Sequence, residues 1–553
     1  MSGTVTKVSG PLVMAAGLED AGAGDMVSVG KRRLAGEILS LSGNGAVIRM
    51  FDPSDGLAFG EEVSDFGGPL AVELGPGLFG GVFDSLLRPL YGGGDQTAVL
   101  WDFVPSVSDG AQVTEGDVIG TVTEAGGFIH RIMLPAGLSG TVVSIQEGSY
   151  AAQDSVCLLR DGEGENHRLT LTQRWPVRKS RPFARKTLPS APLHSGIRAV
   201  DTFFPLAKGG TALISGAAGS GKTVLLQSLA GCSDADVIVY VCCGGRGNEI
   251  STLRNALSEM KDENGVSLLG RTVVIADTDD MPPASREAAV YAGATVAEYC
   301  RDMGYSVILL VDTLSAWAEG LREISEKLGE AVCEDAYPAY LGSRISELFW
   351  RAGQVNCLGR EGRRGELTII GSVSTSSGDA QETVLKSARR CVKVHLSLTD
   401  SREYPSVDFV TSFSMYAESL RERLTGELGE RFMSSRDTAL SALQSESPDA
   451  VTRMTASALR EGFIIQNAFE ENDRSSSSAR QTILLRLITD CGGICRAAVA
   501  EGADPEKIAA IRLGEKIEKL KYFTDAELVE SAKRITENMR NRTDAILAGE
   551  AEV

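Results

Sequence analysis

The sequence contains no long hydrophobic run and no paired cysteine motif. No apolar stretch among its 553 residues approaches the roughly 18 residues that a membrane-spanning helix needs. Its ten cysteines are scattered and form no C-x-x-C pair, so they indicate neither a zinc site nor a disulfide framework. The first residues also lack the charged region and the apolar block of a signal peptide. We therefore expect a protein of a reducing, cytosolic compartment.

Positive charge is also scarce. The 55 lysines and arginines are outnumbered by 74 aspartates and glutamates, which gives a formal net charge of −19 and an isoelectric point near 4.9. Nucleic acid and anionic lipid surfaces would repel such a chain at long range, so neither is expected as its main partner. With 43% hydrophobic and 23% charged residues, the sequence is typical of a globular protein and is long enough for several domains.

A glycine-rich pattern at residues 211–226, TALISGAAGSGKTVLL, is the strongest motif. It has the spacing G-x-x-x-x-G-K-T of a phosphate-binding loop, and it lies between a predicted strand (Thr211 to Ser215) and a predicted helix (Thr223 to Ala230). The glycines let several backbone N–H groups point at one polyphosphate, and the helix N-terminus adds partial positive charge. A purely structural glycine-rich turn is the alternative, but such a turn would not need the pair Lys222 and Thr223.

Each part of this loop has an expected task. Lys222 would reach the outer phosphates, and the Thr223 hydroxyl would ligate the magnesium that travels with them. The residues expected to bind the nucleotide are Gly216, Ala217, Ala218, Gly219, Ser220, Gly221, Lys222, Thr223 and Val224.

The sequence divides into four predicted regions. Short strands broken by glycine, asparagine and aspartate predict a small β-barrel over residues 1–75, and residues 95–185 predict a β-rich insertion. In 76–94 and 186–415, apolar strand runs alternate with helical stretches, which predicts an α/β P-loop nucleotide-binding domain with a mostly parallel sheet. Residues 416–553 have apolar residues at three- and four-residue spacing, which predicts an α-helical bundle.

The segment Trp175 to Pro182, WPVRKSRP, falls at the end of the predicted insertion. Its prolines and basic residues predict a connector between domains. Because the basic run is short, we expect this connector to be solvated rather than to bind an anion.

A candidate magnesium ligand follows one of the apolar strand runs. Ligands of parallel sheets bind at the carboxyl ends of the strands. Asp312 ends the run Val307 to Val311, which is where nucleotide-hydrolysing folds usually present a magnesium-orienting carboxylate. The alternative is a carboxylate that only caps the next helix. A second candidate segment, Gly244 to Glu249, follows the run Val237 to Val241.

Short motifs are spread in order along the whole chain. They are Gly3–Val13 (GTVTKVSGPLV), Glu73–Gly77 (ELGPG), Trp175–Arg178 (WPVR), Asp201–Pro205 (DTFFP), Met281 and Pro282, Met303–Tyr305 (MGY), Trp317–Glu319 (WAE), Tyr337–Leu341 (YPAYL) and Gln466–Phe469 (QNAF). In sequence and order they resemble the A subunit of the V/A-type rotary ATPases, the catalytic alpha chain. The stretch 95–185 is similar to the insertion that distinguishes this chain from its F-type relatives. The resemblance implies a RecA-like nucleotide-binding core.

The resemblance also implies an enzyme that works within a large assembly. In this family, A and B subunits alternate in a hexameric head, which is joined by central and peripheral stalks to a membrane ion-conducting sector. The head couples ATP hydrolysis or synthesis to proton or sodium transport, as a peripheral complex on the cytoplasmic face of the membrane. The implied cofactors are ATP or ADP and Mg²⁺. The B subunit is the implied donor of an arginine across the interface, and no nucleic acid partner is expected.

Three further residues receive roles from the resemblance. Arg246 matches an arginine that contacts the γ-phosphate, and Asp312 would orient magnesium through water. Tyr404, in Glu403-Tyr-Pro405, falls where the family places an aromatic ring against the adenine. Taken alone, Tyr404 would be interpreted as an ordinary core aromatic.

Two positions depart from the family pattern. Where the family has Gly-Glu-Arg, this sequence has Gly244-Gly245-Arg246, so the carboxylate expected to orient the attacking water is absent. Where the family has an arginine four residues beyond the magnesium-orienting aspartate, this sequence has Ala316. Losing a positioned general base typically costs about 10²–10⁴ in rate.

Glu249 is a candidate substitute for the missing base. It lies four residues after Gly245, so the two residues would share one face if this segment is helical. The alternative is a structural role for Glu249.

Three functions are therefore considered. The first is the nucleotide-binding A subunit of a V/A-type rotary ATPase or ATP synthase. The second is a nucleotide-binding but catalytically impaired structural paralogue of that chain, which Gly245 and Ala316 would indicate. The third is a hexameric nucleic-acid translocase on a related core, which the acidic charge balance disfavours.

Overall fold

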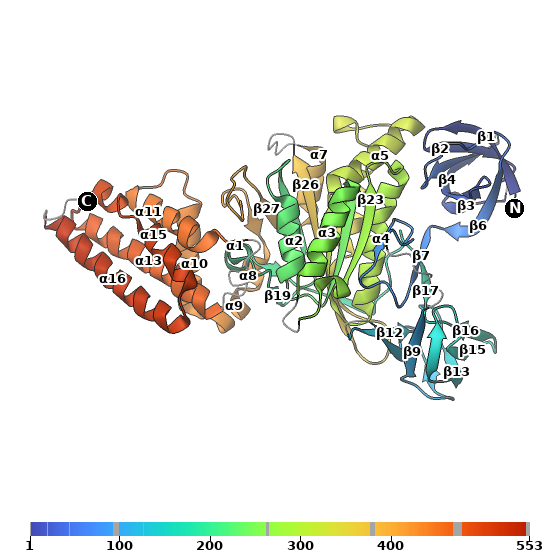
Figure 1. Ribbon diagram of the computed structural model, residues 1–553, viewed down its shortest axis with the longest axis horizontal. Coiled ribbons are helices and arrows are strands. Elements are labelled where there is room, and N and C mark those ends of the chain that lie inside the picture. Colours follow the sequence, from blue (N-terminus) through green and yellow to red (C-terminus); the bar gives the residue numbers. More distant parts are fainter. Residues whose placement is uncertain are drawn as a thin grey trace. The chain divides into compact units, whose positions relative to one another are not determined.

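The structure is a computed structural model that describes residues 2–18, 20–43, 45–91, 99–124, 127–261, 265–375, 382–467 and 478–548. The chain forms two compact units, and Figure 1 colours it from the N-terminus to the C-terminus. The first unit comprises the described parts of 1–189, 235–373 and 381–391, and the second comprises those of 190–234, 374–380 and 392–553. Because these units cut across the predicted nucleotide-binding region, the four domain boundaries stay a prediction.

The first unit begins with a closed barrel of six strands in the order β1-β2-β5-β4-β3-β6. Side chains alternate between the two faces of each strand. In β2, Val13 and Ala15 are buried, whereas Met14 between them is 42% exposed. The predicted β-barrel is confirmed. The strands are β1 (Ser2–Ser9), β2 (Leu12–Ala16), β3 (Asp25–Val29), β4 (Leu34–Ser42), β5 (Gly45–Met50) and β6 (Glu62–Pro69).

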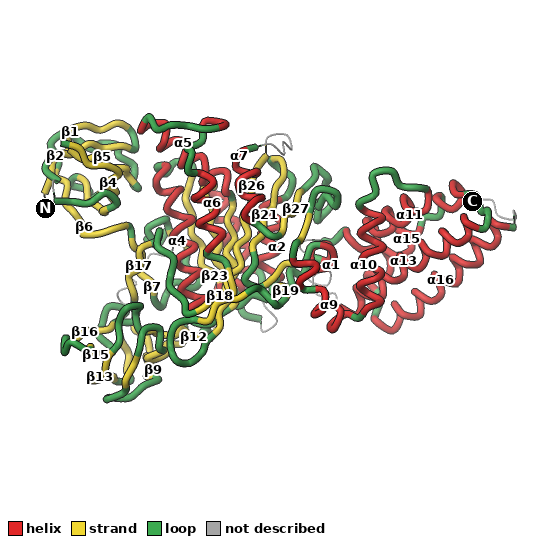
Figure 2. The backbone as a smooth tube through the Cα atoms, turned by 180° about the vertical axis from the view of Figure 1, so that it is seen from behind, coloured by secondary structure: helices red, strands yellow, loops and turns green. Residues whose placement is uncertain are grey.

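The predicted β-rich insertion contains two four-stranded sheets, in the orders β10-β13-β15-β16 and β12-β11-β9-β14. Phe103 of one sheet and Val142 and Leu159 of the other belong to one hydrophobic core. The strands are yellow in Figure 2. They are β9 (Leu100–Pro105), β10 (Gln112–Val113), β11 (Val118–Thr123), β12 (Ile129–Met133), β13 (Gly140–Ile145), β14 (Gly148–Ala151), β15 (Cys157–Asp161) and β16 (Asn166–Leu169).

The segment expected to be a solvated linker is instead held by buried ion pairs, so this prediction was wrong. Its first residues end strand β17 (Gln173–Pro176), which pairs with β7 (Ala71–Leu74). Further along, the side chain of Arg181 is only 6% exposed, and its Nε donates to Asp302 Oδ2 at 2.7 Å. A planar guanidinium can be buried when carboxylates receive its N–H groups, and the local sequence does not show where those carboxylates lie.

Four charged side chains, Glu37, Arg49, Arg178 and Glu287, form a group that we call the Glu287 cluster, in which all but the 25% exposed Arg178 are buried. Arg178 contacts Glu37 at 2.6 Å and Glu287 at 2.9 Å, and Arg49 contacts the same two carboxylates at 2.8 and 3.0 Å. Burial raises the pKa of Glu287, but the guanidiniums of Arg178 and Arg49 outweigh this effect and lower the pKa to about 2. Glu37 and Arg49 belong to the barrel and Glu287 to helix α4 (Pro283–Asp302), so the cluster ties the barrel to this helix.

The first unit also contains parallel strands in the order β26-β24-β22-β23-β8. Their almost continuous apolar runs are typical of parallel strands that are buried on both faces. Helices α4 and α5 pack on β22. The elements are β8 (Val82–Phe83), β18 (Arg185–Thr187), β22 (Val237–Gly245), β23 (Thr272–Thr278), β24 (Ser306–Asp312), β25 (Gly353–Asn356), β26 (Arg364–Thr375), α3 (Gly247–Glu259), α5 (Leu314–Leu328), α6 (Leu341–Trp350) and α7 (Thr383–Cys391).

In the second unit, β21 lies parallel to β27, and β28 pairs antiparallel with β27. The C-terminal helices, red in Figure 2, bury Leu484, Leu485 and Ile488, which confirms the predicted helical bundle. The elements are β19 (Pro192–Leu193), α1 (Arg198–Phe203), β20 (Leu206–Ala207), β21 (Thr211–Ala217), α2 (Lys222–Cys232), β27 (Val394–Ser397), β28 (Phe413–Ser414), α8 (Tyr416–Ser419), α9 (Arg421–Leu428), α10 (Glu430–Leu443), α11 (Ala450–Leu459), α13 (Ser478–Ala500), α14 (Pro505–Ala509), α15 (Leu513–Glu518) and α16 (Asp525–Leu547).

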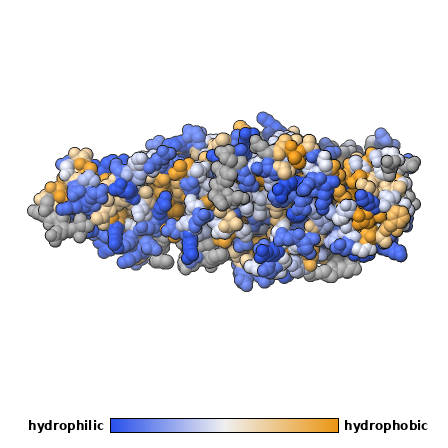
Figure 3. All heavy atoms as spheres, turned by 90° about the horizontal axis from the view of Figure 1, so that it is seen from above, coloured by the Kyte–Doolittle hydropathy of each residue, from blue (hydrophilic) through white to orange (hydrophobic). Residues whose placement is uncertain are grey.

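Hydrophilic side chains cover much of the face drawn in Figure 3, and hydrophobic patches lie between them. Within the described part of the chain, no helix combines the length and the apolar character that a membrane span requires.

Replacing Glu287 by glutamine should lower the free energy of unfolding by about 3 kcal/mol, because the buried guanidinium of Arg49 and the partly buried one of Arg178 would lose a charged partner. Because the pKa of Glu287 is lowered, the free energy of unfolding should also depend on pH. Glu287 contributes stability above its unfolded-state pKa of about 4.3, and this contribution is lost as the pH falls towards 2. Urea denaturation at pH 7 and pH 3 should therefore show a smaller difference for Glu287→Gln than for the parent.

The exposed residue Glu326 provides the matched control. Glu326→Gln should change the free energy of unfolding by less than about 0.5 kcal/mol. Equal stability of the parent and Glu287→Gln at pH 7 would contradict the stabilising role of the cluster.

Candidate nucleotide-binding site

The turn between β21 and α2 forms the phosphate-binding candidate in the second unit. Gly221, the N-cap of α2, has a φ of 93°, and Gly219 has a φ of 83°, which are conformations that only glycine adopts readily. A Cβ added to either residue would meet no atom within 4 Å, so both positions are open. At Gly216 the turn favours glycine because of close packing, since a Cβ there would lie 2.4 Å from Ser220 Oγ.

The Lys222 side chain lies inside this turn. Its Nζ donates to the backbone carbonyls of Gly216 at 2.9 Å and Ala217 at 2.7 Å, and the residue is only 7% exposed. Ala218 and Thr223 are exposed. The turn thus brings together an ammonium group, an accessible hydroxyl and the N-terminal amides of a helix, which is a suitable arrangement for binding a polyphosphate.

A pocket of about 280 Å³ lies beside the turn and is lined in part by Gly219, Ser220 and Gly221. The other lining residues are Val224, Leu225, Leu398, Ser401, Arg402, Glu403, Tyr404, Pro405 and Ser406. The aliphatic side chains and the one tyrosine ring in this lining suit a flat aromatic ligand. Val224 and Tyr404, both expected from the sequence to contact the nucleotide, line this one pocket.

Ser406 and Gln466, which were not predicted as site residues, form hydrogen bonds to residues that line this pocket. Ser406 Oγ donates to the Ser220 carbonyl at 3.0 Å. The Gln466 N–H donates to the Tyr404 carbonyl at 2.8 Å, and Gln466 Oε1 accepts the Arg198 N–H at 2.7 Å. Gln466 belongs to the QNAF motif, but the motif alone did not indicate that it supports Tyr404.

Asp312 lies at the carboxyl end of β24 in the first unit, as expected, and is 8% exposed. Two buried hydroxyls hold its carboxylate: Tyr240 donates to Oδ2 and Ser372 donates to Oδ1, each at 3.0 Å. Burial and the nearby Asp312 raise the pKa of Tyr240 well above its usual value, so the phenol remains a donor. A carboxylate fixed in this way is oriented by side-chain contacts and not by a helix cap.

Arg246 and Glu249 follow β22 at the start of α3, and both are exposed. The Arg246 N–H donates to Glu249 Oε2 at 3.2 Å. This bond satisfies an amide near the helix N-terminus, so the carboxylate serves as a cap in this structure. A catalytic role for Glu249 stays a prediction.

A side chain at Gly245 would meet the thiol of Cys242 in this structure. A Cβ at this position would lie 2.5 Å from Cys242 Sγ. Burial, with Asp312 nearby, raises the pKa of the Cys242 thiol to about 12, so this group is neutral at pH 7 and does not replace a carboxylate. Next to it, a Cβ at Gly244 would lie 3.2 Å from Ala316 Cβ, so Ala316 also faces this turn.

Asp277 is a buried carboxyl that the sequence analysis missed. It ends the strand run Val273 to Ala276 in the same way that Asp312 ends its own run, which was the available signal. Ser285 Oγ donates to Asp277 Oδ1 at 3.1 Å, and no partner for Oδ2 is found among the described residues. Burial raises the pKa of Asp277 to about 7, so this group titrates near neutral pH, unlike an ordinary aspartate.

The candidate residues therefore form two sets. Arg246, Glu249 and Asp312 lie at the carboxyl ends of β22 and β24 in the first unit. The phosphate-binding turn and Tyr404 belong to the second unit. The second set is chemically suited to bind a polyphosphate attached to a flat ring, whereas the first supplies a cation and a fixed carboxylate.

Family models agree with this architecture. The ATP synthase alpha/beta family, nucleotide-binding domain, matches residues 196–414. The barrel-sandwich domain of ATP synthase alpha/beta chains matches residues 96–178, and the beta-barrel domain of the same family matches residues 5–67. The last two ranges coincide closely with the β-rich insertion and the six-stranded barrel.

Several known proteins are similar to the chain over its full length. The V-type ATP synthase alpha chain of Acetivibrio thermocellus is 40% identical over 586 aligned residues, which cover 100% of both chains. That of Clostridium novyi is also 40% identical and covers 100% of this chain and 99% of its own. The A subunit of the A-type ATP synthase of Methanopyrus kandleri is 39% identical over 99% of each chain. The chain therefore belongs to the family of V-type and A-type ATP synthase alpha chains.

Proposed function

We propose that this chain is the nucleotide-binding A subunit of a V/A-type rotary ATPase or ATP synthase, an enzyme that couples ATP hydrolysis or synthesis to proton or sodium transport across a membrane. The observation that carries this proposal is the turn between β21 and α2, with Lys222 inside it. Full-length relatives named V-type ATP synthase alpha chain support it.

The described residues suggest how ATP would be held. The amides of residues 216–223 and the Lys222 ammonium would bind the phosphates, and Lys222 would exchange its carbonyl contacts for phosphate oxygens. The adenine would lie in the pocket against Tyr404. Arg246 is exposed and available to contact the γ-phosphate. Because phosphoryl transfer needs little covalent chemistry from the protein, these residues would act by positioning water and phosphate and by stabilising charge.

The residues present also fit a magnesium ion. Thr223 offers an exposed hydroxyl, and oxygen ligands are those that Mg²⁺ prefers. Each oxygen of Asp312 accepts a hydrogen bond from one hydroxyl and has a second lone pair for a water molecule on the ion. When bound, Mg²⁺ would neutralise part of the charge on the phosphates.

The proposed assembly is a hexameric head in which copies of this chain alternate with copies of the B subunit. The latter would supply an arginine to each site, so the isolated chain should hydrolyse ATP very slowly. Central and peripheral stalks would join the head to a membrane ion-conducting sector, with this chain peripheral on the cytoplasmic face. The support for this assembly is that the relatives are chains of V-type and A-type ATP synthases.

The rate of turnover depends on Gly245 and Ala316. The position expected to carry a water-orienting carboxylate is a glycine whose side-chain space is filled by the Cys242 thiol. We therefore propose that turnover is slower than in a family member with that carboxylate, whereas the phosphate-binding turn with Lys222 is intact and nucleotide binding is retained. The chain would then be a nucleotide-binding but catalytically impaired A subunit, which is the second of the three functions considered from the sequence. No observation favours the nucleic-acid translocase.

Lys222→Ala should weaken the binding of ATP with Mg²⁺ by about 2–3 kcal/mol, or roughly 30- to 150-fold, because a charged hydrogen-bond donor to the phosphates is lost. Isothermal titration calorimetry on the full-length chain measures this change. Lys208, which pairs with Asp234 outside the turn, provides the control, and Lys208→Ala should bind like the parent. Equal affinity of the parent and Lys222→Ala would overturn the proposed function.

Tyr240→Phe should increase the Mg²⁺ concentration needed for half-maximal nucleotide binding by about fivefold, because Asp312 loses one of its two hydroxyl donors. Ser372→Ala should have a similar effect through the other oxygen. Tyr91→Phe, at a partly exposed tyrosine that does not contact Asp312, should leave the Mg²⁺ dependence unchanged. Identical Mg²⁺ titrations for all four proteins would show that Asp312 does not act on the ion.

The double variant Cys242→Ala with Gly245→Glu should increase ATP hydrolysis by the reconstituted head by about 10²–10⁴, because it supplies a carboxylate and removes the thiol that blocks it. Gly245→Glu alone should increase the rate of ATP hydrolysis by a smaller factor, because the Cβ of the new side chain would meet Cys242 Sγ. Cys242→Ala alone serves as the control and should hydrolyse ATP at the parent rate. An unchanged rate in the double variant would contradict the explanation of slow turnover.

A further inference from the structure

A group of potential metal ligands lies outside the nucleotide machinery, on the hairpin that joins β15 to β16 in the insertion. Asp161 ends β15, Glu165 directly precedes β16, and His167 is the second residue of β16. Glu165 and His167 are two residues apart and therefore point to the same side of the strand. The Asp161 N–H donates to the Glu165 carbonyl at 3.0 Å, which places Asp161 across from Glu165.

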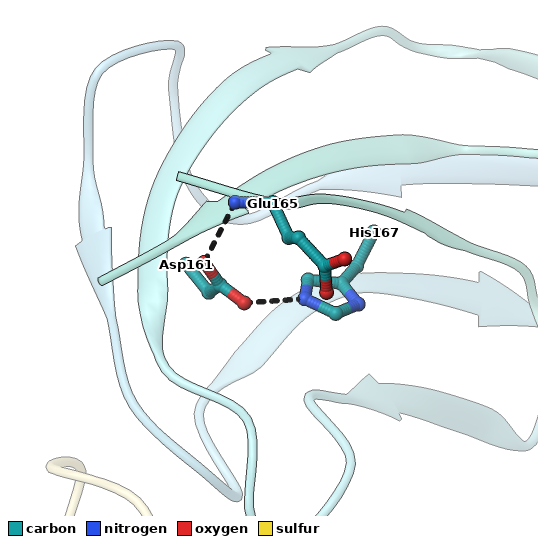
Figure 4. A group of neighbouring side chains, drawn as sticks. All are labelled: Asp161, Glu165 and His167. Carbon is teal, nitrogen blue, oxygen red and sulfur yellow. Dashed lines mark hydrogen bonds and ion pairs between the residues drawn. The ribbon is translucent and has the colours of Figure 1, made fainter. Parts of the chain in front are cut away.

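The three side chains converge, as Figure 4 shows. One ligand atom from each residue lies within 4.8 Å of the other two. Asp161 Oδ2 is 2.7 Å from His167 Nε2. The other oxygen, Asp161 Oδ1, accepts the N–H groups of Glu163 and Glu165, each at 2.9 Å, so the backbone of the turn fixes this carboxylate. The backbone of the turn therefore fixes Asp161, and the Asp161 carboxylate in turn holds the imidazole.

The charge and exposure of the hairpin also favour a cation. Asp161, Glu163 and Glu165 follow each other at alternate positions, and within the described part of the chain no lysine or arginine forms an ion pair with any of them. The side chains of His167 and Asp161 are 31% and 20% exposed, so an ion from solvent can reach them.

We propose that Asp161, Glu165 and His167 bind one divalent transition-metal ion, of which Zn²⁺ is the representative. The imidazole nitrogen favours such an ion over Ca²⁺ and Mg²⁺, which prefer oxygen ligands only. When Nε2 of the neutral imidazole binds the ion, the ring proton is carried on Nδ1 instead, and bonds to the ion replace the hydrogen bond between Nε2 and Asp161 Oδ2. The usual ligand distance from such an ion is about 2.0–2.2 Å, so the Glu165 side chain would rotate to place one oxygen on the ion, and water would complete the coordination. The ion links the two strands at the end of the hairpin.

Calorimetric titration of the full-length chain with Zn²⁺, in a buffer with excess Mg²⁺, tests this proposal. The parent should bind one Zn²⁺ ion at the hairpin. His167→Gln keeps a hydrogen-bonding side chain but loses the imidazole, and Glu165→Gln loses a carboxylate, so each should weaken Zn²⁺ binding by at least about tenfold. Glu163→Gln makes the same charge change on the same hairpin outside the ligand set, so it should bind Zn²⁺ like the parent.

A parallel titration with Co²⁺ distinguishes this site from the ten cysteines, because thiolate ligands add strong charge-transfer absorption and carboxylate and imidazole ligands do not. Circular dichroism checks that all variants are folded. Unchanged Zn²⁺ affinity in His167→Gln would overturn the proposal, as would an equal loss in Glu163→Gln or binding seen only with the thiolate signal. These results are independent of whether the chain binds ATP.

Discussion

The proposed function depends on how the backbone turns between β21 and α2. Gly219 and Gly221 adopt positive φ, which lets the chain pass from a buried strand directly into a helix with its first amides facing outward. Lys222 is held inside the same turn by two carbonyl oxygens. An anion that enters the turn therefore meets a positively charged group and helix amides that are already in place.

Two buried sites in the first unit show two ways of holding a buried carboxylate. In the Glu287 cluster, two guanidiniums hold two carboxylates between the barrel and α4. At Asp312, two neutral hydroxyls hold the carboxylate by hydrogen bonds, and neither hydroxyl brings a positive charge. The difference matters for the proposed magnesium ion, because an arginine neutralises its partner carboxylate, whereas no arginine or lysine among the described residues forms an ion pair with Asp312.

Much of the fold was predictable because it follows from local periodicity. Alternating burial in the strands, continuous apolar runs in the parallel sheet and helical spacing near the C-terminus are all visible in the sequence. The phosphate-binding turn was predictable for a similar reason, since its residues are contiguous. The place of Tyr404 in the pocket was predicted only through the resemblance to rotary ATPases, because an isolated tyrosine carries no such signal.

The remaining features depend on residues that are distant in sequence. Arg178 forms ion pairs with carboxylates that lie more than a hundred residues before it and after it in the sequence. Local composition does not show these partners and therefore suggested a solvated linker. The support of Tyr404 by Gln466 is likewise invisible until the chain is folded. Gly245 was predictable in part. The resemblance to the family shows that a carboxylate is missing at this position, whereas the close approach to the Cys242 thiol is visible only in the coordinates.

Hydrogen–deuterium exchange of the full-length chain, with and without saturating ADP and Mg²⁺, tests the central claim most directly. If the turn binds phosphate through its backbone, the nucleotide should slow exchange of the amides of residues 216–224 more than exchange in the helices of the C-terminal bundle. Unchanged exchange across residues 216–224 in the presence of bound nucleotide would contradict the account.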